Sequence, residues 1–331
     1  MTPAPRVTVA VLGTGKFGAA MALLLARAGH EVRVWARRPA ASALLAKAAP
    51  AAERMRAAAT IEEACAGAAL IAFAVPVGAL REVARTAGNV TDGGQIALHA
   101  CRGVDAGFTL AHQVIRQETC LRKIGVLGGP LYFDELTSSP GERGRPLVAV
   151  VASRFDELHR VIRAAVAGTR VRVHATYDVV GVEVAGAISN VSHLAAGIAE
   201  GLGLGETDQG LLLTHGLVEA TRIGRALGAE RSTFSGLAGV GDLIPRAVTS
   251  VRRHRSLGAE IGGGREATQA AKAQPDLEGP HTLREARALG QRLGLALPLI
   301  EAVDDVLHRG ERPAAALERV LSLDLDLDVV A

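Results

Sequence analysis

A glycine-rich segment near the amino terminus has the residue types and spacing of a dinucleotide-binding turn. Gly13, Gly15 and Gly18 form the pattern G-x-G-x-x-G between an apolar run and a helical pattern. In such a turn the first glycine allows a tight bend, the second lets the backbone approach a pyrophosphate, and the third permits close packing of helix on strand. The positive end of the helix attracts the anion. We therefore expect a cofactor site that includes Lys16 and Phe17; the alternative is a bare strand-to-helix turn.

Two arginines follow the second expected strand, where NAD-specific sites usually carry an acidic residue for the ribose hydroxyls. The chain reads Trp-Ala-Arg-Arg there, ending in Arg37 and Arg38, and offers no carboxylate. Guanidinium groups suit a 2′-phosphate, which favours NADPH and leaves NAD as the second option. The alternative is that both arginines are solvated residues ahead of a helix. Val75 and Pro76 end another expected strand, where a chain of this fold would pass the nicotinamide ribose.

The elements that would position these residues alternate between strands and helices. Helical spacing is seen at residues 15–28, closed by Gly29, and again between most of the later strands. Apolar runs predict strands at residues 7–12, 32–36, 56–60, 70–75, 95–100, 124–128, 147–152 and 171–175. This alternation predicts an α/β fold with a parallel, doubly wound sheet, a Rossmann domain.

The strand pattern stops after Tyr177 and Asp178. Helices are predicted from there on at about residues 179–201, 207–227, 252–261, 283–293, 299–308 and 314–320. A chain of 331 residues also exceeds what one hydrophobic core usually serves. The sequence thus predicts a dinucleotide-binding Rossmann domain at residues 1–176 and an all-helical substrate domain at residues 177–331.

Composition and charge exclude several classes of protein. Hydrophobic residues make up 49% of the chain and charged residues 21%, which is typical of a globular protein. A net charge of +3 is too small for a nucleic-acid footprint, and the short arginine clusters suit the phosphate of a small molecule. Three cysteines without Cys-x-x-Cys spacing indicate neither disulfides nor a metal site. Without a signal core or an apolar run of membrane-spanning length, we expect a cytoplasmic protein with no membrane insertion.

Taken together, these segments resemble the bacterial NAD(P)-dependent glycerol-3-phosphate dehydrogenases over nearly the whole chain. The matching segments lie in order at residues 11–18, 29–32, 70–76, 101–103, 128–130, 135–136, 181–183, 186–191, 239–243 and 277–279. The resemblance implies hydride transfer between the nicotinamide and C2 of dihydroxyacetone phosphate or glycerol 3-phosphate. The expected partners are thus a small phosphorylated or anionic substrate and a second copy of the chain, in a homodimer.

The resemblance breaks at residues that would touch the substrate. As hydride arrives, the substrate oxygen becomes negative and needs a proton donor. The family places a lysine for this at the position of Ser189, and a second lysine at that of Arg102, which keeps the charge but not the proton lability. The family's Arg-Asn pair that holds the substrate phosphate corresponds to Arg253 and His254. Asp242 is retained.

Further roles follow for three residues. The resemblance implies that Asn190 binds the substrate and that Glu278 binds the cofactor. A serine hydroxyl is too weak an acid to replace a lysine by itself. His193 lies four positions after Ser189, on the same helix face, and would be the proton donor with Ser189 as a relay. The alternative is a histidine packed in a helix interface and satisfied by a local hydrogen bond.

Three functions stay open at this point. The first is a reductase that acts on dihydroxyacetone phosphate or a related carbonyl. The second is a specialised reductase of a different carbonyl or an imine, for which the missing lysine matters less because an iminium already carries its proton. The third is a catalytically silent NADPH-binding protein with an interaction role.

Three other features are less specific. His215 and Glu219 share a helical face, and this spacing suits a structural surface pair better than a metal site. Residues 137–146 form a Pro- and Gly-rich insertion relative to the family. In residues 321–329, Leu alternates with Ser or Asp, as in a half-buried strand or a frayed terminus.

Overall fold

The chain divides into two compact units, seen here in a computed structural model that describes residues 6–39, 41–43, 52–131, 146–245 and 249–324. The first unit consists of residues 1–101 and 111–179, and the second of residues 102–110 and 180–331. Residues 102–110 therefore belong to the second unit although they come from the first third of the sequence. The insertion at 137–146 lies, except for its last residue, outside the described residues, as does most of the alternating tail.

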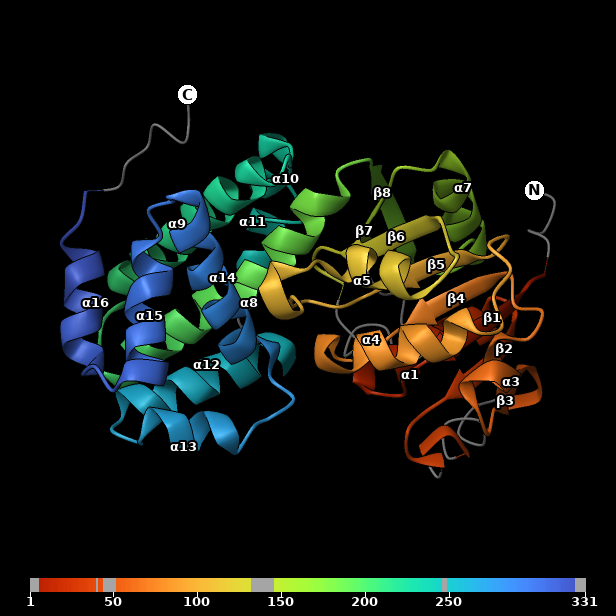
Figure 1. The fold of residues 1–331 in the computed structure, drawn as a ribbon, viewed down its shortest axis with the longest axis horizontal. Coiled ribbons are helices and arrows are strands. Elements are labelled where there is room, and N and C mark those ends of the chain that lie inside the picture. Colours follow the sequence, from red (N-terminus) through yellow and green to blue (C-terminus); the bar gives the residue numbers. More distant parts are fainter. Residues whose placement is uncertain (1–5, 40, 44–51, 132–145, 246–248, 325–331) are drawn as a thin grey trace. The chain divides into compact units, whose positions relative to one another are not determined.

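The first unit is built on one sheet, whose described strands have the order β3-β2-β1-β4-β5-β6-β7-β8 (Figure 1). The strands are β1 (Thr8–Leu12), β2 (Glu31–Trp35), β3 (Met55–Ala57), β4 (Leu70–Phe73), β5 (Ile96–His99), β6 (Lys123–Gly128), β7 (Leu147–Ser153) and β8 (Val171–Thr176). Neighbouring strands run parallel, except that β6 and β7 are antiparallel. The expectation of an entirely parallel sheet is wrong at this pair, because an apolar run carries no information about strand direction.

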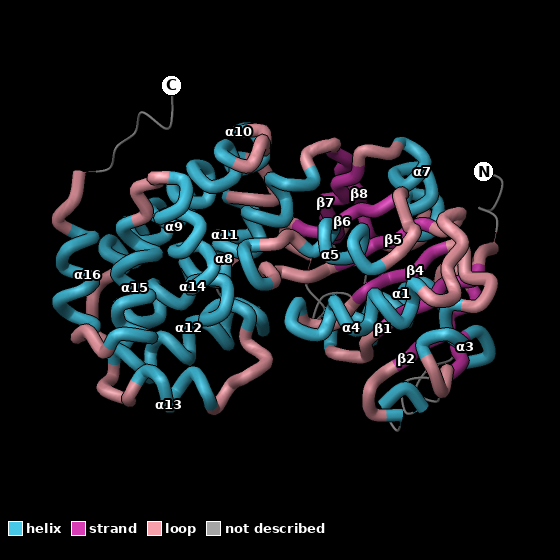
Figure 2. The backbone as a smooth tube through the Cα atoms, in the orientation of Figure 1, coloured by secondary structure: helices cyan, strands magenta, loops and turns pink. Residues whose placement is uncertain are grey.

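Helices cover both faces of the sheet, with the strands between them (Figure 2). The helices of this unit are α1 (Lys16–Arg27), η1 (Ala52–Arg54), α3 (Ile61–Cys65), α4 (Val77–Gly88), α5 (Ala111–Glu118) and α7 (Asp156–Ala165). In β1, Ala10 and Leu12 pack in a cluster with α3, α4 and α5, whereas Val9 and Val11 pack in a second cluster with α1 and α7. Alternate side chains point to opposite faces, so a strand buried on both reads as a continuous apolar run.

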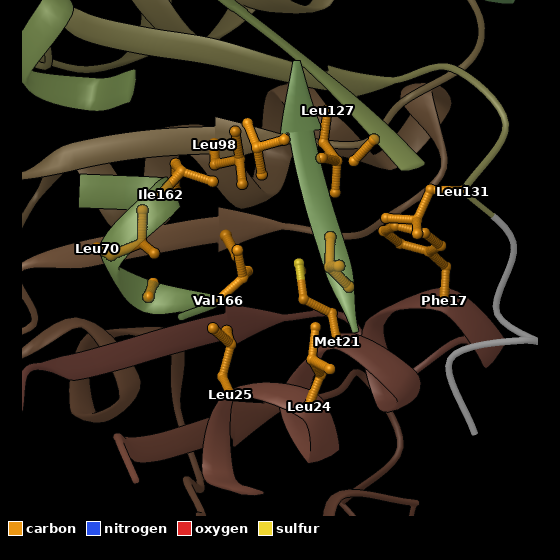
Figure 3. Close-up of a pocket in the computed structure, with 15 residues that line it drawn as sticks. Phe17, Met21, Leu24, Leu25, Leu70, Leu98, Leu127, Leu131, Ile162 and Val166 are labelled. Carbon is orange, nitrogen blue, oxygen red and sulfur yellow. The ribbon is translucent and has the colours of Figure 1, made fainter. Parts of the chain in front are cut away.

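A small apolar cavity lies between the sheet and the helices α1 and α7 (Figure 3). Its volume is about 30 Å³, and side chains such as Phe17, Met21, Leu131 and Ile162 line it. Its lining is entirely apolar, so water in it would find no hydrogen-bond partner. The cavity is a packing defect in the core of the first unit.

The second unit is helical, which confirms the predicted combination of a Rossmann domain with an all-helical domain. Its elements are η2 (Ala106–Phe108), α8 (Val179–Gly201), α9 (Glu206–Ala226), α10 (Arg231–Ser235), α11 (Val240–Leu243), α12 (Thr249–Gly262), α13 (Ala267–Lys272), α14 (Glu278–Leu293), α15 (Pro298–Arg309) and α16 (Pro313–Leu321). Helix α8 is long and apolar enough to cross a membrane by length and composition, contrary to our reading of the sequence. The most apolar part of α8 is 89% buried within the protein, as in the core helix of a globular unit.

Helices α8 and α12 touch backbone to backbone at glycines. A Cβ atom at Gly197 would lie 2.2 Å from the carbonyl oxygen of Arg255, and one at Gly258 would lie 2.2 Å from a carbonyl oxygen of α8. Gly201 and Gly262, one turn further on, leave equally little room. Because no side chain separates the two helices at these glycines, α12 packs closely on α8, and its polar residues His254 and Arg255 are buried.

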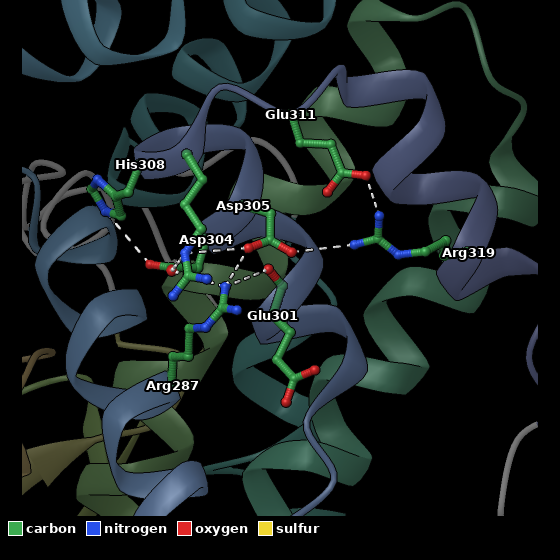
Figure 4. A network of polar contacts seen from close by, with 8 residues as sticks. Arg287, Glu301, Asp304, Asp305, His308, Glu311 and Arg319 are labelled. Atoms are coloured by element: carbon green, nitrogen blue, oxygen red, sulfur yellow. Dashed lines mark hydrogen bonds and ion pairs between the residues drawn. The ribbon is translucent and has the colours of Figure 1, made fainter.

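Helices α14, α15 and α16 are joined by an ion-pair network (Figure 4). Arg287 of α14 contacts Asp304 at 3.0 Å and Asp305 at 2.5 Å, both on α15. Arg319 of α16 contacts Asp305 at 3.3 Å and also pairs with Glu311. Asp304 is nearly fully buried, so its charge requires such partners. The network fixes α14, which carries residues of the candidate site.

Candidate active site

The glycine turn follows the end of β1, and the space around it explains its residue types. Gly13 has φ +107°, and a Cβ atom there would lie 2.5 Å from the carbonyl oxygen of Ala74. A Cβ atom at Gly18 would lie 2.1 Å from the carbonyl oxygen of Gly13. Gly15, in contrast, faces open space. The first and third glycines are thus needed for packing, and the second leaves a free approach to the backbone.

This turn suits the pyrophosphate of a dinucleotide. Gly15 is the N-cap of α1 and provides no side-chain cap, so the first N–H groups of the helix are not satisfied by a capping side chain. Both Gly15 and Lys16 are exposed, and an anion here would meet these N–H groups and the positive end of the helix dipole. The side chain of Phe17 does not take part in this anion site: its ring lines the apolar cavity beside Leu131 (Figure 3). Phe17 would therefore meet a cofactor only through its backbone.

Other cofactor-site residues predicted from the sequence lie at the ends of neighbouring strands. Arg37 and Arg38 follow β2 and are both exposed. Pro76 is the N-cap of α4, just beyond β4. The preceding Val75 accepts a hydrogen bond through its carbonyl oxygen from the Cys101 thiol at 3.3 Å. These carboxyl ends lie at the switch point of the strand order, where open α/β sheets bind their ligands.

Arg102 and Asp242 form a paired charge in the second unit. Nη1 of Arg102 donates to Oδ1 of Asp242 at 2.7 Å, and Nη2 donates to Oδ2. Asp242 is only 1% exposed. A bidentate pair of this kind holds a guanidinium in one orientation. Arg102 is therefore a fixed cation rather than a mobile proton donor.

The backbone of Arg102 is held from two further helices. Its N–H donates to the Glu278 carboxylate at 3.3 Å, and its carbonyl oxygen accepts from the Asn190 side-chain amide at 2.8 Å. Oδ1 of Asn190 is buried and makes no hydrogen bond to any described residue. The structure thus brings together the predicted residues Arg102, Asn190, Asp242 and Glu278. Glu278 contacts Arg102 in this arrangement, and its assignment to the cofactor stays a prediction.

Ser189 and His193 lie on the same face of α8, as their spacing predicts, and both are buried. Burial, with a smaller contribution from the charges of Arg102, His254 and Arg255, lowers the pKa of His193 to about 3. An imidazole with that pKa is neutral at neutral pH, and the remaining N–H of a neutral imidazole is far too weak an acid to serve as a proton donor. The proposed role of His193 as proton donor is therefore disfavoured. The hydroxyl of Ser189 makes no hydrogen bond to a described residue, and no relay to His193 is seen.

The two residues predicted to bind the substrate phosphate, Arg253 and His254, lie in different environments on α12. His254 is buried, and its Nε2 accepts a hydrogen bond from the N–H of Gly279 at 3.2 Å. A Cβ atom at Gly279 would lie 2.6 Å from the imidazole, so the ring packs tightly against the start of α14. Arg253 is exposed. Of the two, only Arg253 has an exposed side chain, and its assignment to the substrate phosphate stays a prediction.

Comparison with known proteins agrees with this arrangement. The family described as NAD-dependent glycerol-3-phosphate dehydrogenase matches the chain twice, its N-terminal part over residues 8–141 and its C-terminal part over residues 178–318. Glycerol-3-phosphate dehydrogenase [NAD(P)+] of Methylibium petroleiphilum is 37% identical over 95% of this chain and 96% of its own length. The corresponding protein of Nitrosospira multiformis is 35% identical, over 95% and 97%. The chain belongs to the NAD-dependent glycerol-3-phosphate dehydrogenase family.

A solved structure from the glycerol-3-phosphate dehydrogenase family supports the fold as well. The crystal structure of glycerol-3-phosphate dehydrogenase from Coxiella burnetii matches with a TM-score of 0.87 at 28% identity, over 96% of this chain and 99% of the other. The resemblance inferred from the sequence is thus confirmed at the level of the family, and with it the use of NAD or NADP by an oxidoreductase.

One buried acidic residue of this glycerol-3-phosphate dehydrogenase family member differs from the expectation based on the sequence. Glu219 is 0% exposed, and its two carboxyl oxygens accept hydrogen bonds from the N–H groups of Leu299 at 2.6 Å and Ile300 at 3.0 Å. His215 is also buried. The expectation of a surface pair is therefore wrong, because Glu219 caps α15 from another helix. Helical spacing shows a shared face but not what packs against it.

Proposed function

We propose that the chain is an oxidoreductase that uses NADPH to reduce dihydroxyacetone phosphate, or a closely related small phosphorylated carbonyl. The observation that carries this proposal is the coverage of both halves of the chain by one family, with the glycine turn of that family complete. The bound nicotinamide would supply the hydride. The residues of the chain would bind the nicotinamide cofactor, orient the substrate and stabilise the negative charge that develops on it.

NADPH is the proposed preference over NADH. Arg37 and Arg38 are exposed at the end of β2, where the adenosine ribose would be read, and no acidic residue accompanies them. Two guanidinium groups attract a 2′-phosphate and offer no acceptor for ribose hydroxyls. The proposed preference for NADPH is thus supported by the residue type and the exposure of Arg37 and Arg38.

At the substrate end, we propose a divergent site in which Ser189 stands at the position of the family lysine. Arg253 would bind the substrate phosphate, because it is exposed on α12, and Arg102 would stabilise negative charge as a fixed cation. Ser189 would donate a hydrogen bond to the reacting oxygen, and water would deliver the proton, since a serine hydroxyl is too weak an acid. Such a site should reduce dihydroxyacetone phosphate slowly.

A second candidate is reduction of an imine or another carbonyl. It is favoured by the state of two buried ionisable groups of the second unit, Asp242 and His193. The carboxylate of Asp242 is engaged by Arg102, and burial holds His193 in its neutral form. A protonated imine needs no acid from the protein at the moment of hydride transfer.

The test separates cofactor binding from turnover. Trp35 is the sole tryptophan of the chain and ends β2, so quenching of its fluorescence should report NADPH binding. Gly15→Val is the matched control, because its side chain would enter the open space that the pyrophosphate needs. Oxidation of NADPH is then followed by its absorbance with dihydroxyacetone phosphate and with small cyclic imines.

Each outcome selects one function. Turnover of dihydroxyacetone phosphate above that of the imines supports the first proposal, and the reverse supports the second. Binding of NADPH without turnover of any carbonyl or imine indicates a silent cofactor-binding protein. Equal binding by Gly15→Val and the wild type would contradict the cofactor site itself. Light scattering of the purified chain tests the expected homodimer.

A further inference from the structure

Residues 102–110 leave the first unit after its strand β5 and are built into the second. Val104, Phe108 and Leu110 are buried in the main hydrophobic cluster of the helical unit. The segment begins with Arg102, whose guanidinium pairs with Asp242. We refer to residues 102–110 as the strap.

The strap has an unusual backbone. Asp105 and Thr109 bond to each other in both directions, with N–H to oxygen distances of 2.8 and 3.1 Å, which closes a tight loop. Gly107 has φ +71° and Phe108 has φ +59°. Within the described part of the chain, Phe108 is the one residue other than glycine with positive φ. A left-handed conformation is costly for a side chain of this size and persists only where the surroundings impose it.

Helix α14 supplies those surroundings. Glu278, Glu285 and Arg292 are spaced seven residues apart, which is close to two helical turns and puts them along one side of α14. Each contacts the backbone of the strap. The N–H groups of Gly107 and Phe108 donate to Glu285 at 2.7 and 3.3 Å, and Arg292 donates to the carbonyl oxygen of Gly107 at 3.3 Å.

The charges of these side chains match the groups that they bind. The two carboxylates accept from N–H groups, and the guanidinium donates to a carbonyl oxygen. Hydrogen bonds with one charged member are stronger than neutral ones. The strained part of the strap is therefore held by ionised side chains of a helix that the Arg287 network also fixes.

We propose that Glu285 and Arg292 are positioning residues of the substrate site, which hold the strap in its strained conformation and thereby fix the Arg102 guanidinium against Asp242. This inference rests on the proposed function, because it assigns Arg102 to the reaction. Neither residue touches the substrate in this proposal; both act through the strap. A displacement of a catalytic group by about 1 Å is enough to reduce the rate by about a hundredfold.

The experiment compares Glu285→Ala and Arg292→Ala with Arg284→Ala, an exposed neighbour on the same helix. Hydrogen exchange of the strap peptide, kcat and KM with dihydroxyacetone phosphate, and NADPH affinity are measured for each. We expect exchange at Gly107 and Phe108 to become at least about tenfold faster in Glu285→Ala, and kcat/KM to fall by about tenfold. NADPH affinity should stay unchanged, and Arg284→Ala should match the wild type. Glu285→Gln, which keeps one acceptor oxygen, should recover part of both losses.

If the wild type reduces dihydroxyacetone phosphate, two results would overturn the proposal. Faster exchange with kcat and KM at their wild-type values would show that the strap is only structural, and unchanged exchange would show that α14 does not hold it. If the wild type does not reduce dihydroxyacetone phosphate, the proposed function fails. The positioning role of Glu285 is then tested by a measurement that does not depend on activity. The NMR signal of the Arg102 Nε–H group, assigned with Arg102→Lys, should shift in Glu285→Ala but not in Arg284→Ala. A signal that does not shift would then refute the role of Glu285.

Discussion

At the scale of single residues, contacts within the protein fix the orientation or the protonation state of the polar side chains in the candidate site. Arg102 is locked by Asp242, His254 uses Nε2 to bind a backbone N–H, and burial keeps His193 neutral. Ser189 is left as the uncommitted hydroxyl among these groups. In the proposed function, these residues would therefore bind and orient a substrate more readily than they would give it a proton.

Ser189→Lys tests the proposal that Ser189 stands where the family has its lysine acid. If dihydroxyacetone phosphate is the substrate, the lysine should raise kcat for it, since general acid assistance is typically worth a factor of about 10² to 10⁴. Ser189→Ala is the reference, and it should lie at or below the wild type. The measurement is NADPH oxidation in the steady state, with thermal unfolding recorded to show that the fold survives. A loss of the native activity without any gain on dihydroxyacetone phosphate would mean that the pocket is shaped for another substrate.

Arg37→Ala combined with Arg38→Ala tests cofactor choice. Loss of hydrogen bonds to a charged 2′-phosphate should weaken NADPH binding by about 1 to 3 kcal/mol, and NADH binding should hardly change. Titration followed by Trp35 fluorescence gives both affinities. Arg160→Ala, an exposed arginine on α7, serves as the control for a general loss of charge. Equal affinity of the wild type for the two cofactors would contradict the assignment.

At the scale of elements, helix ends and helix contacts determine where the site residues lie. The N-terminus of α1, which has no side-chain cap, would provide the proposed anion site, and glycines let α12 lie directly on α8. The start of α15 is capped by Glu219 from α9, a residue 80 positions away from the first N–H that it binds. The cap by Glu219 stabilises the helical unit through polar groups, in addition to its apolar core.

Glu219→Ala should destabilise the second unit. The N–H groups of Leu299 and Ile300 would lose their acceptor in a buried place, at a cost of about 1 to 3 kcal/mol. Denaturant unfolding followed by circular dichroism measures the change. Glu301→Ala, at an exposed position in the first turn of α15, is the matched control and should have little effect. A Glu219→Ala variant as stable as the control would show that the cap contributes nothing.

At the scale of the whole molecule, the buried histidine couples stability to pH. The pKa of His193 falls from 6.5 to about 3 on folding. At pH values below the pKa of the unfolded chain, His193 is protonated in the unfolded state but stays neutral in the folded state. The contribution of His193 is therefore fully present above pH 6.5 and is lost as the pH falls toward 3, by at most about 1.4 kcal/mol per pH unit.

His193→Gln should flatten this part of the pH profile. The free energy of unfolding is measured from about pH 7 down to about pH 4, and the slope of the variant should be smaller than that of the wild type. His174→Gln, at an exposed position on β8, should keep the wild-type slope. An identical slope in His193→Gln and the wild type would mean that folding does not lower the pKa of His193.

The sequence by itself determined the Rossmann domain, the glycine turn and most helices of the second unit. Apolar periodicity and glycine positions are local properties, so residues close in sequence were enough to show them. Gly13 and Gly18 were recognised from spacing alone, and the structure supplied the backbone atoms that any larger side chain would meet.

Tertiary structure decided what depends on distant neighbours. The antiparallel β6–β7 pair, the burial of Glu219 and the neutral state of His193 all arise from contacts that spacing along the chain does not encode. The strap is the clearest case, because Arg102 meets a carboxylate 140 positions further on and Gly107 meets one 178 positions further on. Burial and nearby charge set the protonation and orientation of a side chain, and both come into being only when the chain has folded.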